Sequence, residues 1–546
     1  MGKRQLVQIS AEQVKKLVEI EGLRKDIAGY PISKKVHIFL QEKLRDEFGE
    51  KVVPPEERVK GRWFEYIREL LPIHIIAPIA LGIVHYSREM IGAEFTKILV
   101  ASESDKSWWC NYKEDIYNIG NFLLTNLRNK KFANAYYKKY EKLVKDMRIE
   151  CQKIRALDFI KFLDKELLKQ YNSFNEKIMH FHALVFDIDA IDVVLEEKMK
   201  AKFQKLLSKK GKEKEFNAKY SILINPPELS YLNMEQLEIY KLAKEVKAKN
   251  ITPNIKKKIN NLVKNYWWTS LGWTVRTEND FKKYLADIKT IIKKNKNIDE
   301  EIRKLTNFTE NTKKEKQKLE KEFNFDKELE YYLEIFEKYV VYHDYRKEIQ
   351  MKGTSVMNKF LFELSRRQGI KYEDLVWAWQ SEIKNYMKTG TIDLENIRKR
   401  KEAYLIVVTK RGIEQLTGEE AIKRRKKELM AAVKNIQDFK GITASLGKIT
   451  GKARVCYSAT DAIHKVNKGD ILIASMTLPD YVTAMKKAAA IVTDEGGVTC
   501  HAAIVSRELK IPCIVGTRIA TRVLHDGDTI EVNANHGTVR IIRRKS

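Results

Sequence analysis

The sequence predicts a multidomain protein, in which a large, mainly α-helical N-terminal region precedes a compact α/β domain at the C-terminus. The length of 546 residues exceeds that of a typical single domain. Before residue 440 apolar side chains recur at helical spacing, and from Thr443 short apolar runs and frequent glycines replace them. We expect a helical region of unknown type at 1–150, a helical substrate- or partner-binding region at 151–440, and the α/β domain at 441–546.

The clearest helical pattern lies in the second region. Its apolar residues follow the i, i+3, i+4, i+7, i+11 spacing that places them on one face of a helix: Leu329, Tyr332, Leu333, Phe336 and Val340. The longest apolar stretch, 70–86, is interrupted by Pro72, His74, Pro78 and His85 and is too short to span a bilayer. We expect it to form a buried helix or a pair of loops.

The C-terminal domain is predicted from strand-length apolar runs separated by turn residues. Glycine, asparagine and aspartate mark the turns at 526–527 and 535–537. One helix is expected from Ala502 to Leu509, before Pro512. The expected strands are 453–456, 470–474, 490–492, 513–515, 529–532 and 538–542.

His501 stands between one of these strands and the helix. Gly496 and Gly497 precede it, so the backbone can approach a ligand closely. The first turn of a helix offers unpaired N–H groups that favour an anion, and a neutral imidazole is a good nucleophile. A lone histidine at a helix start is more often a cap or a surface residue, so position alone does not establish a site.

The whole stretch 493–516 resembles the mobile, swivelling phosphohistidine domain of the phosphoenolpyruvate-utilising enzymes, such as phosphoenolpyruvate synthase and pyruvate phosphate dikinase. The likeness also covers the segments 444–451, 469–472 and 477–479, and hence most of 441–542. The positions that match the family motif are Thr493, Asp494, Gly496, Gly497, Thr499, Cys500, His501, Ala502, Ala503, Ile504, Arg507, Glu508, Leu509, Ile511, Pro512, Val515 and Gly516.

The resemblance implies a swivelling (β/β/α) domain in which His501 is transiently phosphorylated. Gly496, Gly497, Thr499 and Cys500 would then surround the phosphoryl group. Thr499 matches a residue that is regulated by phosphorylation in some relatives, and it is equally suited to cap the helix. Cys500 is read as a small packing residue rather than as a second nucleophile.

A second candidate site lies in the helical region, where aromatic and basic residues gather. Trp267, Trp268 and Trp273, together with Arg346 and Lys347, would suit a pocket for an anionic or flat substrate. An aromatic core with snorkelling basic side chains is the somewhat favoured alternative. These segments more weakly resemble the helical region that precedes the mobile domain in phosphoenolpyruvate-synthase-like proteins.

The segment Met179-His-Phe-His182, with Asp187 and Asp189, has the residue types of a metal site. The two histidines point to different sides of a helix, so a structural role is preferred and no metal site is assigned. The five scattered cysteines have no metal-type spacing, and the N-terminus lacks the apolar core of a secretory signal. We expect a reduced, cytoplasmic protein.

The net charge of +29 invites a nucleic-acid function, but the charge is spread along the chain. Residues 441–546 contain 15 Lys+Arg and 9 Asp+Glu, a net of +6, which leaves +23 for residues 1–440. Binding to nucleic acid is therefore not favoured.

The resemblance also implies domains that the sequence does not display. Relatives carry an ATP-grasp domain and often a barrel for phosphoenolpyruvate, and residues 1–440 contain no glycine-rich phosphate loop or βα repeat. The leading hypothesis is a phosphotransferase component with ATP or phosphoenolpyruvate as donor and an unknown acceptor. Either a separate ATP-grasp or phosphoenolpyruvate-binding chain charges His501, or the helical region binds a donor or acceptor in an unfamiliar manner. Mg²⁺ is expected for the transfer, although no cofactor is assigned to the chain itself. The alternative is a non-catalytic regulatory or binding protein that keeps the swivelling domain.

Overall fold

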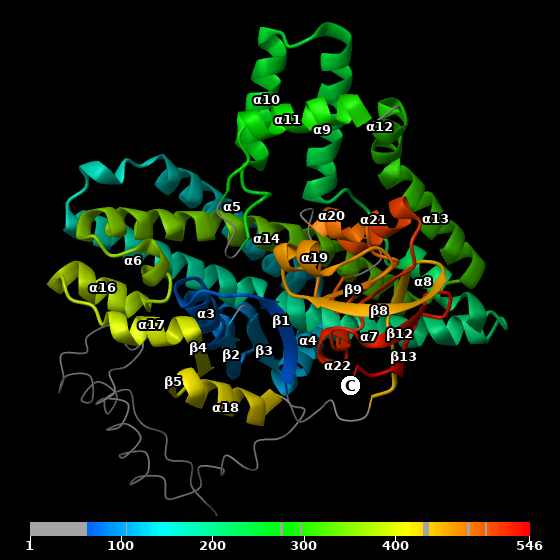
Figure 1. The fold of residues 1–546 in the computed structure, drawn as a ribbon. Helices are drawn as coiled ribbons and strands as arrows, with labels where there is room; N and C mark the ends of the chain where they lie inside the picture. Colours follow the sequence, from blue (N-terminus) through cyan, green and yellow to red (C-terminus); the bar gives the residue numbers. More distant parts are fainter. Residues whose placement is uncertain are drawn as a thin grey trace, which may run out of the picture.

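The computed structural model describes residues 63–104, 106–272, 277–294, 297–429, 436–477, 481–496 and 500–545. Three residues singled out from the sequence, Trp273, Gly497 and Thr499, lie outside these ranges, as do residues 1–62. Figure 1 shows a large helical body, a helical lobe that projects from it, and a C-terminal domain that rests against the body.

A five-stranded antiparallel sheet lies within the helical body. Its order is β1-β3-β2-β4-β5, so strands from both ends of the body lie side by side. The interior strand β4, between β2 and β5, is buried along almost its whole length. The strands are β1 (Trp63–Glu69), β2 (Lys97–Glu103), β3 (Lys106–Tyr112), β4 (Ala403–Thr409) and β5 (Gly412–Thr417).

The apolar stretch at 70–86 forms the buried helix α3 (Ile73–Ile91), which confirms the first of the two expectations for it. Pro72 caps its start, and the helix ends at Gly92 in the left-handed conformation with φ +92°. At Gly82, a Cβ atom would lie 2.3 Å from the backbone oxygen of Met179, so only glycine lets α3 and α6 approach this closely. Among the described residues, no helix is long and apolar enough to cross a bilayer.

Long helices make up most of the body, and one of them, α6, packs along α3. The longest, α14, packs against α5, α6 and α7. The helices are α4 (Lys113–Asn126), α5 (Lys130–Ala156), α6 (Asp164–Val185), α7 (Asp187–Ser208), α8 (Phe216–Leu223) and α14 (Lys327–Gln368), with short 3₁₀ turns at Phe159–Lys161 and Glu213–Glu215.

The face of α14 that meets the core differs from the one that apolarity alone selects. Leu329 and Tyr332 are buried as expected, but Leu333, Phe336 and Val340 are only partly buried. Ile335, Tyr339 and Tyr342 take the core positions instead. Tyrosine rings supply much of the buried surface here, and the Tyr339 hydroxyl donates to the Asp187 carboxyl group at 2.6 Å.

A separate lobe with its own small core rises from the body (Figure 1). The charge-dense residues 298–323 form two helices on this side of the molecule. The helices are α9 (Tyr231–Lys249), α10 (Pro253–Tyr266), α11 (Phe281–Lys294), α12 (Ile298–Thr306) and α13 (Phe308–Phe323).

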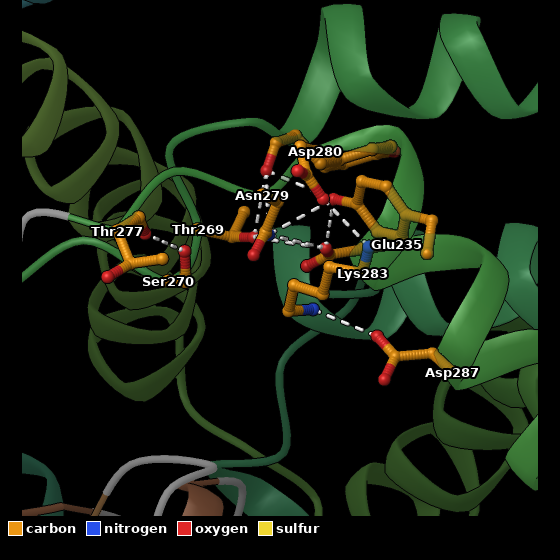
Figure 2. A network of polar contacts seen from close by, with 10 residues as sticks. Glu235, Thr269, Ser270, Thr277, Asn279, Asp280, Lys283 and Asp287 are labelled. Atoms are coloured by element: carbon orange, nitrogen blue, oxygen red, sulfur yellow. Dashed lines mark hydrogen bonds and ion pairs between the residues drawn. The ribbon is translucent and has the colours of Figure 1, made fainter.

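A buried carboxyl group holds the base of the lobe together (Figure 2). Glu235 of α9 accepts hydrogen bonds from the hydroxyls of Tyr284 at 2.6 Å and Thr269 at 3.0 Å, and from the Asn279 amide at 3.3 Å. Burial raises the pKa of Glu235. Every donor in the network comes from α11 or from the loop before it, so its role is to fix that loop.

After α14 the chain returns to the five-stranded sheet through short helices. Arg400 of α17 is buried and forms a bidentate ion pair with Glu382 of α16, with two N–O distances of 2.5 Å. The helices of this part are α15 (Tyr372–Leu375), α16 (Gln380–Thr389), α17 (Leu394–Glu402) and α18 (Gly418–Leu429).

The C-terminal domain is built on an eight-stranded sheet in the order β6-β13-β12-β8-β9-β10-β11-β7. Strands β8 to β11 are parallel, and the remaining pairs are antiparallel. The strands are β6 (Asp438–Lys440), β7 (Ile442–Ser445), β8 (Lys448–Cys456), β9 (Ile471–Ala474), β10 (Ala490–Thr493), β11 (Cys513–Val515), β12 (Thr529–Asn533) and β13 (Thr538–Arg543). The helices are α19 (Ala459–Lys465), α20 (Val482–Met485), α21 (His501–Leu509) and α22 (Ala520–Val523).

Charged residues join the C-terminal domain to the body. Arg522 pairs with Glu65 of β1 at 3.2 Å, and Arg518 pairs with Glu196 of α7 at 2.5 Å. The Lys106 ammonium lies 4.1 Å from the centre of the Tyr457 ring. Three contacts from three different body elements thus fix how the domain is seated.

The mainly helical N-terminal region with a C-terminal α/β domain is confirmed, but the five-stranded sheet was not predicted. The first six residues of β4, Ala403 to Val408, form an unbroken apolar run, whose spacing does not distinguish a strand from a buried helix segment. The predicted boundary at residue 150 falls inside α5, and residues from both sides share the sheet. The division into 1–150, 151–440 and 441–546 stays a prediction.

Candidate functional site

His501 is the first residue of α21, as the sequence predicts for its neighbourhood. Its ring is partly buried, and burial lowers its pKa to about 4, so the imidazole is neutral near pH 7. The Nδ1 atom lies 2.9 Å from the Thr477 hydroxyl oxygen, which fixes the orientation of the ring. Thr477 lies in the segment 477–479, which shares the family likeness but was not predicted to be part of the site.

The loop before His501 is held by buried polar contacts. Asp494 accepts hydrogen bonds from the hydroxyls of Thr517, at 2.9 Å, and Thr521. Gly496 has φ +101°, and a Cβ atom there would lie 2.7 Å from the Cys500 sulfur. This position therefore requires glycine for both its conformation and its space.

The start of α21 presents backbone N–H groups beside the imidazole. Its N-cap residue is Cys500, which makes no side-chain capping bond. Burial raises the pKa of the Cys500 thiol, which therefore stays protonated and is a poor nucleophile. The geometry agrees with the interpretation of Cys500 as a packing residue.

His501 faces a cavity of about 1400 Å³ between the C-terminal domain and the helical body. Gly496, Cys500, Arg518 and Arg522 line it from the same side as His501. The opposite wall comes mainly from β1, α3, β3, α7, α9 and α14, and much of it is apolar. That wall includes Phe64, Ile76, Ile79, Trp109, Phe186 and Val193. A volume of this size accommodates a molecule larger than a simple organic acid.

The body's wall also carries charge, and most of it is paired. Arg346 of α14 donates to Asp189 of α7 at 2.6 Å, and its guanidinium lies over the Phe186 ring. Arg148 forms a bidentate pair with Glu348, with the shortest distance 2.6 Å. Such fixed guanidinium groups are suited to bind phosphoryl oxygens.

The predicted aromatic and basic pocket is divided between two places. Arg346 and Lys347 line the cavity, but Trp267 and Trp268 do not. These two tryptophans are buried in a small core with Met351, and Arg155 and Lys352 lie over their rings. The alternative of an aromatic core with snorkelling basic groups therefore describes them better, and Trp273 lies outside the described residues.

The histidines of the 179–182 segment belong to the body rather than to a metal site. His180 stacks on Tyr86, and His182 is fully buried with its pKa lowered to about 3 by burial. Asp187 accepts hydrogen bonds from tyrosine hydroxyls, and Asp189 pairs with an arginine. Within the described ranges, no three His, Cys, Asp or Glu side chains are grouped as metal ligands would be.

Several residues that shape the site were not found from the sequence. Arg518 and Arg522 line the cavity from the C-terminal domain, while His343 and Asp192 line it from the body. The spacing Arg518-x-x-x-Arg522, which begins two residues after Gly516, was a usable signal for the first two. His343 and Asp192 are 151 positions apart, so no local pattern links them.

Comparisons with known proteins agree with this geometry. Residues 466–537 match the sequence family described as "PEP-utilising enzyme, mobile domain". The chain is 52% identical over 122 residues to a "Probable phosphoenolpyruvate synthase" of Archaeoglobus fulgidus, which covers 22% of this chain and 16% of that protein. It is 45% identical over 151 residues to the "Phosphoenolpyruvate synthase" of Pyrococcus furiosus, which covers 27% of this chain and 17% of that protein.

The chain spans less than a fifth of the length of these curated relatives. A solved structure titled "NMR solution structure of Enzyme I (nEIt) protein using two 4D-spectra" is 18% identical, with 36% of this chain and 55% of that chain covered, at a TM-score of 0.15. A score that low has no bearing on the fold. The sequence matches include the loop and helix that hold His501, and residues 466–537 therefore carry the mobile domain of the phosphoenolpyruvate-utilising enzymes.

Proposed function

We propose that the protein is a phosphotransferase component, in which His501 carries a phosphoryl group and the C-terminal domain swivels to deliver it. One observation supports this most strongly: the neutral imidazole of His501 lines a large cavity whose far wall belongs to another part of the chain. A phosphoryl group on His501 would face that wall, so an acceptor in the cavity would lie within its reach. We regard the helical body as the acceptor-binding part.

The contact with Thr477 indicates which ring nitrogen of His501 takes the phosphoryl group. With its hydroxyl oxygen 2.9 Å away, Nδ1 can donate its proton to Thr477. In that tautomer Nε2 keeps its lone pair and attacks phosphorus. The ring then carries phosphoryl on Nε2 and a proton on Nδ1, and it leaves as neutral imidazole when the group moves on.

In this proposal four residues surround the phosphoryl group. Gly496 and Cys500 are among the described residues, and Gly497 and Thr499 are outside them. The N-terminus of α21 favours negative charge next to His501. Thr499 stays a proposed regulatory position. Phosphate on it would place a second negative charge beside the first and oppose charging of His501.

We infer that the donor is ATP or phosphoenolpyruvate and that a separate ATP-grasp or phosphoenolpyruvate-binding chain presents it. Mg²⁺ would enter with the donor phosphates, since the described residues offer no cluster of protein ligands for it. The family relation of the C-terminal domain supports this choice of donors.

The test is the intact mass of the full chain after incubation with Mg²⁺ and either ATP or phosphoenolpyruvate, with and without host lysate, at alkaline pH. We expect an acid-labile phosphoryl adduct that is absent from His501→Ala and present in Cys500→Ser. An adduct that appears only with lysate would identify a separate charging chain. No adduct under any condition, or an adduct that persists in His501→Ala, would reject the carrier role and favour the regulatory alternative.

A further inference from the structure

A second histidine faces the same cavity from the wall opposite His501. His343 of α14 has its Nε2 atom 2.6 Å from the Asp192 carboxylate of α7. Both side chains are about two-fifths exposed, at 39% and 40%, and both line the cavity. The pair is therefore accessible to a molecule bound there, unlike the fully buried His74 and His182.

The carboxylate selects the tautomer of this ring. Asp192 accepts the Nε2 proton of His343, which leaves the lone pair on Nδ1. A carboxylate that holds an imidazole in this way orients it and stabilises it when it takes up a second proton. The arrangement is that of a general base.

Arg346 lies beside this base and donates a long hydrogen bond, of 3.4 Å, from one of its guanidinium nitrogens to Nδ1 of His343. The hydroxyl of a bound acceptor would take the place of this weak bond. The other terminal nitrogen is held at 2.6 Å by Asp189, which itself accepts a bond from Asn111 at 3.2 Å. A proton acceptor and a fixed cation thus lie side by side on one wall of the cavity.

We propose that His343 is the general base that activates a hydroxyl group of the acceptor, with Asp192 as its positioning residue. This inference rests on the proposed carrier role of His501. The hydroxyl oxygen attacks phosphorus, and an O–P bond forms as the P–Nε2 bond of His501 breaks. The electron pair of that bond returns to His501 Nε2, and the hydroxyl proton moves to His343 Nδ1. Arg346 neutralises charge on the phosphoryl oxygens.

The base also specifies the class of acceptor. A carboxylate or phosphate acceptor is already ionised near pH 7 and needs no proton removed, whereas an alcohol must lose its proton during the transfer. The pair of His343 and Asp192 therefore indicates an alcohol. The surrounding apolar wall excludes water from the carbon skeleton of such a molecule and leaves only its hydroxyl near the charged groups.

The experiment separates charging of His501 from its discharge. Potassium phosphoramidate, a small phosphoryl donor that needs no partner chain, charges the full-length protein, and excess reagent is removed. Methanol is then added as the acceptor, and methyl phosphate and inorganic phosphate are measured by ³¹P NMR with time. The variants are His343→Gln, Asp192→Asn, His501→Ala, and His464→Gln as a control at an exposed histidine outside the cavity.

We expect wild type, His343→Gln, Asp192→Asn and His464→Gln all to be charged. Formation of methyl phosphate should fall about 100-fold in His343→Gln and about 10-fold in Asp192→Asn, and stay at the wild-type rate in His464→Gln. A further variant, His343→Ala, should be as slow as His343→Gln, and added imidazole should partly restore its rate. A circular dichroism spectrum and a thermal transition that match wild type show that a slow variant is folded.

One outcome would contradict the role of His343 as the base, and another would contradict the carrier role of His501. If His343→Gln is charged and releases methyl phosphate as fast as wild type, His343 is not the base, while the carrier role stands. If wild type takes up no more phosphoryl than His501→Ala, the proposed function itself fails and the base assignment with it.

Discussion

The two walls of the cavity are built in different ways. On the C-terminal side, His501 is positioned by neighbours within 25 residues in the chain, among them Thr477, Gly496 and Cys500. On the body side, the pairs join residues far apart: Arg346 with Asp189, His343 with Asp192, and Arg148 with Glu348 are separated by 157, 151 and 200 positions. The first wall depends on backbone conformation, and the second depends on side-chain contacts between helices.

This difference predicts where each wall is vulnerable. A wall set by a glycine loop tolerates the loss of single distant contacts, because its geometry is local. A wall set by contacts between α5, α7 and α14 depends on each buried polar group that keeps those helices together. Substitutions in the two walls should therefore reduce stability by different amounts, and four predictions test this.

The largest effect is expected at Asp187, at the start of α7. It is fully buried and accepts hydrogen bonds from the hydroxyls of Tyr136 at 2.7 Å and Tyr339 at 2.6 Å, which brings α5, α7 and α14 together. Asp187→Ala leaves both hydroxyls without that acceptor and should lower the free energy of unfolding by about 3–5 kcal/mol. Asp187→Asn keeps an acceptor oxygen and should cost about 1 kcal/mol. Urea unfolding measures both, and equal costs would contradict the role of the hydrogen bonds.

The second prediction concerns the pH dependence of the same contact. Burial raises the pKa of Asp187 from 3.8 to about 7, so the folded protein keeps a proton that the unfolded chain has already lost. Stability from this group is therefore complete below about pH 4 and is lost as pH rises towards 7, by about 2–4 kcal/mol.

Asp187→Asn cannot titrate, so the difference in unfolding free energy between wild type and this variant isolates the effect. The difference should change steadily between pH 4 and 7, with wild type losing stability relative to the variant as pH rises. A difference that does not vary over this range would show that the carboxyl group keeps an ordinary pKa.

The third prediction concerns the ion pairs that join the C-terminal domain to the body. Arg522 pairs with Glu65, whose side chain is only 7% exposed and whose pKa is raised by burial, whereas Arg518 and Glu196 are 42% and 29% exposed. Arg522→Ala leaves a buried carboxylate unpaired and should weaken seating of the domain by about 2–3 kcal/mol. Arg518→Ala should cost less than about 1 kcal/mol.

Small-angle X-ray scattering tests this, since a domain released from the body increases the radius of gyration. The increase should be clear for Arg522→Ala and small for Arg518→Ala. The reverse order would mean that the solvent exposure of an ion pair does not decide how strongly it holds the domain against the body.

The smallest effect on stability is expected in the loop of the C-terminal wall. Gly496→Ala places a Cβ atom 2.7 Å from the Cys500 sulfur at φ +101°, and should cost about 2 kcal/mol. Gly390 is a matched control, because it also has a positive φ, at +70°, but nothing lies within 4 Å of its Cβ position. Gly390→Ala should cost about 1 kcal/mol.

Phosphoryl uptake by His501 should fall in Gly496→Ala and stay unchanged in Gly390→Ala, because only the first substitution moves the loop beside the imidazole. Thermal unfolding and intact mass measure the two effects. A Gly496→Ala variant as destabilised as Asp187→Ala would remove the contrast between the walls.

Local signals account for what could be predicted. The helical character of the body follows from apolar spacing, and the helix at His501 follows from a strand, two glycines and an apolar run in succession. The five-stranded sheet could not be predicted, since β4 pairs with β2 across some three hundred residues. The role of the tryptophans could not be predicted either, because an aromatic cluster in sequence fits a core as well as a pocket.

The sequence by itself determined the C-terminal wall. Residues next to His501 in the chain fix the backbone conformation that presents its side chain, so a local sequence pattern is enough to predict it. Only the tertiary structure decided the opposite wall. The packing of α7 against α14 decides which carboxylate pairs with Arg346. The same packing brings His343 to Asp192. Such packing is fixed by the whole hydrophobic core, and no short stretch of the chain records it.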